Sequence, residues 1–263
     1  MVKSHLPGDP LPSGEIPGWL VAVLRLGFFG ILVFFWWLAS IYVARNLVPS
    51  PLETFAAAQR LYVDGRWQQG IQASMTTYGS GYFLAAAVAI PLGMLMGAFN
   101  LLGKTLEIYV YALSATPRVA FIPMIIVLLG LGFEAKVFIV FLGAVMPIII
   151  NTYAGVRQAD PELIEMARSV GAGRLRIFWR IVLPGALPFV IVGLRLGATT
   201  GLINTVVAEL YTAISGLGGL LALYGNTFRM AEYFVIVLTL AAIGIIVTEA
   251  LRYVELRLSR WRG

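Results

Sequence analysis

Apolar runs about as long as a bilayer core is thick alternate along this chain with short polar segments. Because about 20 helical residues cross the hydrocarbon region of a membrane, the pattern predicts six transmembrane helices. We expect them at residues 26–48, 77–99, 105–131, 135–153, 187–211 and 233–253. The fold class is therefore an all-α membrane protein, with a transmembrane domain over residues 26–253. The Pro- and Gly-rich residues 1–25 and the basic residues 254–263 are expected to be tails.

Two segments depart from this simple pattern. Pro117 and Pro123 interrupt the third apolar run, which predicts a kinked or broken helix. Residues 49–76 are mixed in polarity, and we expect them to hold one short amphipathic helix.

Composition excludes several classes of function. The chain is 59% hydrophobic and only 12% charged, against about 25% charged residues in an average soluble domain, so it has too little polar surface for a soluble globule. It has no cysteine and a single histidine, His5, expected in the solvated tail, which excludes a disulfide framework and a thiolate metal site. Asp160, Glu162 and Glu165 do not share one helix face, and a membrane-embedded enzyme is therefore disfavoured.

The basic residues indicate topology. A net charge of +6 points to nucleic acid in a soluble protein, but in a membrane protein lysine and arginine gather in cytoplasmic loops. Most of those outside the six runs fall on the side that carries both termini. We therefore expect both termini in the cytoplasm and no nucleic-acid partner.

The polar loop at residues 154–184 is the most informative segment. Asp160 can cap a helix whose first residue is Pro161, an apolar stripe follows at helical spacing, and Gly171 is expected to end this helix. We expect Pro184 and Pro188 to reset the chain direction before the fifth span. Such a helix suits either docking of a soluble partner or contact with lipid phosphates at the membrane surface.

The spacing within this loop resembles a known motif. The EAA loop of ABC-type importer permeases follows the pattern E-A-A-x3-G-x9-I-x-L-P. Every fixed position matches here except the first alanine, which is Met166. The segments SPLE at 50–53, PRVAFIP at 117–123, PGALP at 184–188, AE at 208–209 and GLG at 216–218 are similar to those of the nitrate/sulfonate/taurine group.

The resemblance implies a permease subunit of an ATP-driven importer that works by alternating access in the bacterial inner membrane. In that family two permease subunits, here expected to be a homodimer, assemble with two cytoplasmic ATPase subunits, and a solute-binding protein delivers substrate from outside. ATP and Mg²⁺ would bind the ATPase, because this chain has no G-x-x-x-x-G-K-[ST] loop; it is not expected to be an enzyme or to hold a cofactor or metal. The implied ATPase-coupling residues are Asp160, Glu162, Glu165, Ala167, Arg168, Gly171, Leu183 and Pro184.

Polar side chains inside the spans are candidates for the translocation pathway, because ionisable groups in a bilayer face a bundle interior or cavity. Arg118 would favour an anionic solute, or it could be structural, paired with backbone carbonyls or with Glu107 or Glu249. The full candidate set is Thr116, Arg118, Arg195, Thr200, Asn204 and Glu209.

Two further alternatives stay open. The glycine stripe Gly193, Gly197 and Gly201 predicts close helix contact, either within one subunit or at a dimer seam. An ATP-independent channel or secondary transporter is the rival function.

Overall fold

The computed structural model describes residues 18–43, 47–212 and 215–259, and the regular structure in these ranges is helical. Helices long and apolar enough to span a membrane are α1 (Gly18–Tyr42), α3 (Arg66–Ala98), α6 (Phe133–Arg157), the stretch Arg174–Thr212 and α11 (Met230–Ser259). A bent pair, α4 (Asn100–Ala115) and Arg118–Leu129, turns by 82° and makes a sixth. The prediction of an all-helical membrane fold with six spans, the third of them broken, is confirmed.

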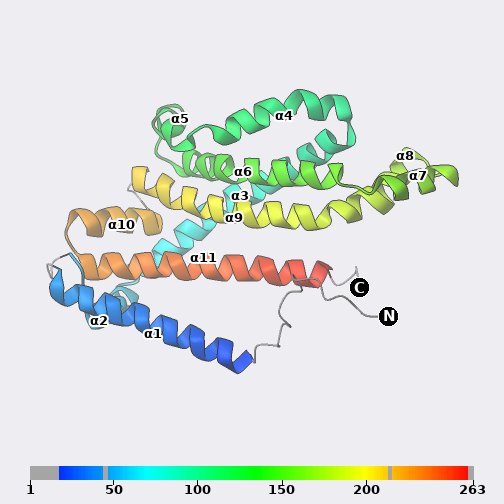
Figure 1. Cartoon of the computed structure of the whole chain (residues 1–263). Helices are drawn as coiled ribbons and strands as arrows, with labels where there is room; N and C mark the ends of the chain where they lie inside the picture. The colour runs from blue at the N-terminus through cyan, green and yellow to red at the C-terminus, as the bar shows by residue number, and fades with distance from the viewer. Residues whose placement is uncertain (1–17, 44–46, 213–214, 260–263) are drawn as a thin grey trace, which may run out of the picture.

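Helix α6 packs against both α3 and α9 (Leu183–Thr212), and it runs alongside α9 in Figure 1. Glycines make both contacts close. A Cβ atom added to Gly93 of α3 would lie 2.7 Å from Thr152 Cβ, and one added to Gly197 of α9 would lie 2.7 Å from Ile148 Cγ1. Gly193 also meets α6. This stripe therefore packs inside the subunit, as the first of the two alternatives predicts.

The first helix begins earlier than predicted. Residues 1–17, with His5, lie outside the described residues, but α1 already starts at Gly18. Arg25 therefore lies within the helix, where a long basic side chain can extend along the helix toward water. Helix α1 is peripheral: it is fixed by Trp36, which stacks on Phe234 at 5.8 Å and donates a hydrogen bond to the Pro49 carbonyl at 3.0 Å. At the other end, α11 continues to Ser259, beyond the predicted limit of 253; residues 260–263 of the predicted tail are not described.

The expected amphipathic helix is α2 (Pro51–Asp64). Ser50 and Glu53 cap its start reciprocally, with Glu53 N–H donating to Ser50 Oγ at 3.2 Å and Ser50 N–H donating to Glu53 Oε2 at 2.8 Å. Gly65, at φ 75°, ends it and lets α3 begin at once.

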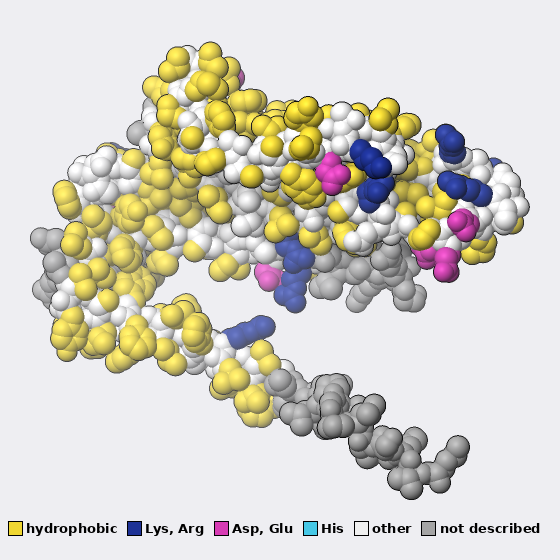
Figure 2. Space-filling model, turned by 45° about the horizontal axis from the view of Figure 1, so that its top comes forward, with side chains coloured by type: hydrophobic (Ala, Val, Ile, Leu, Met, Phe, Trp, Pro, Cys, Tyr) yellow, Lys and Arg dark blue, Asp and Glu magenta, His cyan; other side chains and the backbone are white. Residues whose placement is uncertain are grey.

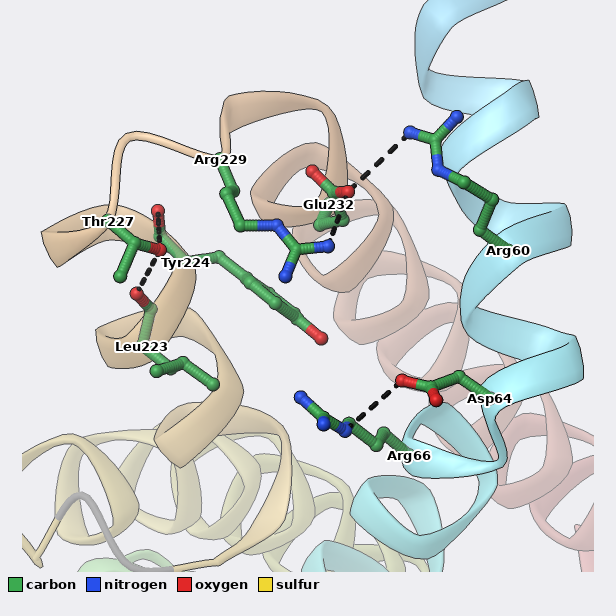
Figure 3. A network of polar contacts seen from close by, with 8 residues as sticks. All are labelled: Arg60, Asp64, Arg66, Leu223, Tyr224, Thr227, Arg229 and Glu232. Carbon is green, nitrogen blue, oxygen red and sulfur yellow. Dashed lines mark hydrogen bonds and ion pairs between the residues drawn. The ribbon is translucent and has the colours of Figure 1, made fainter.

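A polar network joins α2 to α10 (Gly216–Asn226) and α11 (Figure 3). Glu232 is in contact with Arg229 at 2.8 Å and with Arg60 at 3.5 Å. The Arg229 guanidinium also lies 5.0 Å from the centre of the Tyr224 ring. Its hydrogen bond to Glu232 raises the pKa of Arg229, while burial raises the pKa of the Tyr224 hydroxyl. The network holds this end of the helices together.

The prolines after the polar loop do not reset the chain direction as predicted. The helix runs without a break through α8 (Arg174–Ile177), a π-helical turn (Phe178–Val182) and α9. Leu183 N–H bonds to the Phe178 carbonyl, five residues earlier, and Pro184, which has no N–H to donate, directly follows this wider turn.

Candidate functional site

Helix α7 (Pro161–Ser169) lies at one end of the molecule, opposite α5 (Ile122–Leu129) and α10 (Figure 1). Asp160 caps it: its Oδ1 accepts from Glu162 N–H at 2.9 Å and from Leu163 N–H at 3.5 Å. At the other end Gly171 adopts φ 80°, and Ala172 N–H returns to the Ala167 carbonyl at 2.9 Å. Both helix ends are thus satisfied locally, so α7 is a preformed helix.

The surface of α7 combines charged and apolar side chains. Glu162, Glu165 and Arg168 are exposed, and both signs of charge gather at this end in Figure 2. Leu163 and Met166 are exposed as well, at 44% and 59%. Large apolar side chains next to charges are typical of protein contact sites.

A groove of about 810 Å³ lies between this loop and the ends of α3 and α6. Ile164 and Arg168 border it from α7, Phe178 borders it from the π-helical turn, and Leu95 and Val156 line the opposite side. The groove separates part of α7 from the bundle, and the chain joins α7 to the end of α6 on one side and to the helix at Arg174–Thr212 on the other. Leu183 and Pro184, the last predicted coupling residues, lie on that helix, at the start of α9.

A second group of predicted residues meets at the bend of the broken span. The Arg118 guanidinium donates to the Gly143 carbonyl at 3.0 Å and to the Ser114 carbonyl at 3.4 Å. Asn204 packs against Gly143 from the other side: a Cβ added to Gly143 would lie 2.5 Å from its Nδ2. Asn204 in turn donates to the Thr200 carbonyl at 2.8 Å. Arg118 and Asn204 thus both contact one glycine of α6, and Thr200 lies one turn before Asn204 on α9.

The structural alternative for Arg118 is partly realised, because backbone carbonyls accept its hydrogen bonds. The guanidinium is half-buried, and its five N–H donors exceed these two contacts, so a pathway role is compatible with this geometry. Thr116 lies two residues earlier and donates to the Ala112 carbonyl at 2.9 Å. Arg195 is half-buried on α9, more than one turn before Thr200.

Glu209 lies apart from this group. It is fully buried near the α10 end of α9, where its carboxylate accepts from Ser74 Oγ at 2.8 and 2.9 Å and from Gly218 N–H at 2.9 Å. Ser74 Oγ accepts from Leu217 N–H at 2.8 Å. These contacts fix the start of α10 on α3 and α9.

The sequence pattern does not predict the burial of Lys136. The topology argument counts it among the basic residues on the outer side, at the start of the run 135–153, and the structure buries it in the first turns of α6, with Nζ donating to Ser215 Oγ at 2.7 Å. Its neighbours Phe133 and Ala135 are apolar, which was the available signal. Within the described ranges no cluster of three His, Asp or Glu residues could hold a metal ion.

Residues 89–260 match the protein family described as binding-protein-dependent transport system inner membrane component. This match covers more than half of the chain. The chain belongs to this family. The matched region includes the 154–184 loop, all of α6, α9 and α10, and the bend at Arg118.

Relatives of this permease agree with the assignment. It is 33% identical to a probable ABC transporter permease of Brucella abortus, over 82% of this chain and 86% of the relative. It is 29% identical to the taurine transport system permease protein TauC of Escherichia coli, over 91% and 90%. With the putative aliphatic sulfonates transport permease protein SsuC of E. coli it shares 31% identity over 81% of each chain.

The fold agrees with solved structures. A chain of the MetNI methionine ABC transporter in an inward-facing conformation superposes with a TM-score of 0.66, at 18% identity, covering 74% of this permease and 97% of that chain. The predicted ABC-type importer permease is confirmed, and an ATP-independent channel or secondary transporter is not favoured.

Proposed function

We propose that this permease forms half of a pathway for a small anionic solute and that ATPase subunits on separate chains drive it through α7. The single observation that carries the proposal is the continuity of the helix at Arg174–Thr212. One end of this helix adjoins α7, and its other half holds Thr200 and Asn204. A displacement of α7 would therefore reach the candidate pathway along one element.

The surface of α7 supports an ATPase as the partner. Leu163 and Met166 are exposed on a helix that is capped at both ends, and an amphipathic helix commonly binds by placing its apolar face in a groove. By the family pattern, Asp160, Glu162, Glu165, Ala167, Arg168, Gly171, Leu183 and Pro184 form the coupling segment. ATP and Mg²⁺ would be bound by the ATPase.

The bend at Arg118 supports an anionic solute. A guanidinium midway along a span attracts anions and repels cations, and broken helices are where transporters place their ligands. The transport systems of TauC and SsuC are named for taurine and aliphatic sulfonates, both of which carry a sulfonate group.

We place α7 and both termini in the cytoplasm and the α10 end outside, in a bacterial inner membrane. The topology argument from basic residues supports this orientation. The exposed apolar side chains of α1 and α11 would meet lipid or a second copy of the chain in a homodimer. A solute-binding protein would dock at the α10 end.

Mild-detergent purification of the tagged chain from its native membrane tests this assembly. We expect one ATPase polypeptide per permease and ATP hydrolysis that a solute-loaded binding protein stimulates. A chain that purifies only with itself, under conditions that preserve known complexes, would overturn the proposal and favour a channel.

A pair of matched variants tests the role of α7. Met166→Asp places a charge on its exposed apolar surface, whereas Leu52→Asp makes the same kind of change on α2, at an even more exposed position. We expect Met166→Asp to lose the ATPase on purification while the permease still folds, and Leu52→Asp to keep it. Retention of the ATPase by both variants would argue against docking through α7.

A further inference from the structure

A polar pocket of about 710 Å³ opens beside the start of α6, at the opposite end of that helix from the coupling loop. Its polar lining comes from three segments and consists of Gln69, Gln72, Thr76, Thr77, Lys136 and Ser215. No acidic side chain is among the residues that line it. The pocket is therefore suited to a ligand that accepts hydrogen bonds and carries negative charge.

The wall formed by α3 indicates that the pocket holds water. Gln69, Gln72 and Thr76 recur three and four residues apart, share one face of the helix, and are exposed. Polar groups facing hydrocarbon are costly. Since α3 has 33 residues, about 50 Å of helix, it is longer than a bilayer core of about 30 Å, and its first turns extend to the membrane surface.

Lys136 places a positive charge in the wall of this pocket. Its side chain is 95% buried, and its hydrogen bond within the described ranges is the one to Ser215 Oγ at 2.7 Å. An ammonium group has three N–H donors. Its position in the first turns of α6 also lies in the positive field of the helix N-terminus, which disfavours a lysine and favours an anion next to it.

Two acidic groups, Glu134 and Glu209, lie near Lys136, and neither is among the residues that line the pocket. Glu209 attracts Lys136 electrostatically, but it does not line the pocket, and its carboxylate already accepts from Ser74 and from Gly218 N–H. The Glu134 carboxylate lies beside the pocket at Gly132, where an added Cβ would be 3.0 Å from Oε2. Lys136 is the charged side chain among the residues that line the pocket.

We propose that this pocket is an outer anion-binding site, in which Lys136, Ser215 and the α3 hydroxyl and amide groups receive an oxoanion such as a sulfonate before it reaches Arg118. The proposal rests on the proposed function for the direction of transport and the solute class. It adds a second cationic position, separate from Arg118 and on another helix, and makes Lys136 a binding residue.

The absence of cysteine from the chain permits a direct test. Gln72→Cys places the only thiol in the pocket of the purified complex in nanodiscs. Its modification rate is measured with an anionic sulfonatoethyl and a cationic trimethylammonioethyl methanethiosulfonate reagent. We expect Lys136→Gln to lower the anion-to-cation rate ratio at least fivefold, because it leaves the carboxylates of Glu134 and Glu209 as nearby formal charges. Lys136→Arg should restore the ratio, and Lys104→Gln, at an exposed lysine of α4, should not change it.

A second measurement keeps Lys136 and therefore does not depend on correct folding of the Lys136→Gln variant. At constant ionic strength in gluconate, methanesulfonate should slow the reaction of Gln72→Cys with uncharged methyl methanethiosulfonate at least twofold, and tetramethylammonium should not. An unchanged rate ratio in a folded Lys136→Gln, or equal rates with both ions, would overturn the proposal. If either of these two results is found and ATP-dependent uptake of taurine or methanesulfonate persists, the pocket assignment alone is wrong. If no anion stimulates ATP hydrolysis, the proposed solute class is overturned.

Discussion

Truncation of Glu209 should destabilise the whole α10 end of the molecule. The side chain is 1% exposed, and its carboxylate accepts two buried hydrogen bonds, from Ser74 Oγ and from Gly218 N–H. In Glu209→Ala both donors lose their acceptor in a site that water does not easily reach. Each unsatisfied buried donor costs about 1–3 kcal/mol, so for the two donors we expect a loss of about 2–6 kcal/mol.

The conservative variant separates hydrogen bonding from charge. Glu209→Gln keeps the size of the side chain and one carbonyl oxygen that can accept from Gly218 N–H or Ser74. We therefore expect it to cost less than Glu209→Ala, about 1.5–3 kcal/mol, the net value of one hydrogen bond to a charged group. Glu249→Ala serves as the control, because Glu249 is largely exposed and its ion pair with Arg252 at 3.4 Å is worth at most about 1 kcal/mol.

The assay is thermal unfolding of the three purified variants in one detergent, followed by tryptophan fluorescence and size exclusion. With about 2–4 °C lost per kcal/mol for a protein of this size, Glu209→Ala should unfold about 10 °C below the unmodified chain. A midpoint within 2 °C of the control would refute the conclusion that Glu209 anchors α10. A normal midpoint with abolished transport would instead place Glu209 in the pathway.

Three other substitutions have defined outcomes. Gly93→Val would push a side chain into Thr152 Cβ at 2.7 Å and the Ile149 carbonyl oxygen at 2.9 Å; we expect a loss of about 1–3 kcal/mol in the same unfolding assay, with no loss for Gly79→Val, where the space is open. Asp160→Ala removes the cap of α7 and about 1 kcal/mol of helix stability, visible as faster hydrogen exchange confined to α7. Arg118→Ala should raise the concentration of anionic solute needed for half-maximal uptake, and unchanged uptake with unchanged solute preference would exclude a pathway role.

The helices and the α7 caps follow from local sequence, which is why they are predictable. Span positions depend on hydropathy over about 20 residues. The cap of α7 depends on neighbours, Asp160 and Pro161, whose preferences act over a single turn. The broken third span is signalled directly by Pro117 and Pro123.

The polar interior could not be predicted in the same way. Ser74 and Glu209 are 135 positions apart, and Lys136 and Ser215 are 79 apart, so nothing local indicates that either pair meets. The continuity of the helix through Pro184 also could not be predicted. A proline predicts a helix break whether or not a π-helical turn precedes it.

The glycine contacts determine how a displacement of α7 can be transmitted. Gly193 and Gly197 of α9, and Gly93 of α3, all pack closely on α6. Packed interiors do not slide continuously, so α9 cannot move along α6 without loss of these contacts. We therefore expect α3, α6 and α9 to move as one body relative to the second copy of the chain.

Distance measurements between spin labels test this rigid-body expectation in the cysteine-free chain. Labels at Thr76 of α3 and Ile203 of α9, both exposed, report a distance within one subunit. Labels at Ile203 in two copies report a distance between subunits. On trapping of the ATP-bound complex we expect the second distance to change by several ångströms and the first to stay constant. A change in the first distance of similar size would show that the glycine contacts open during transport, and that α9 moves independently of the two helices packed beside it.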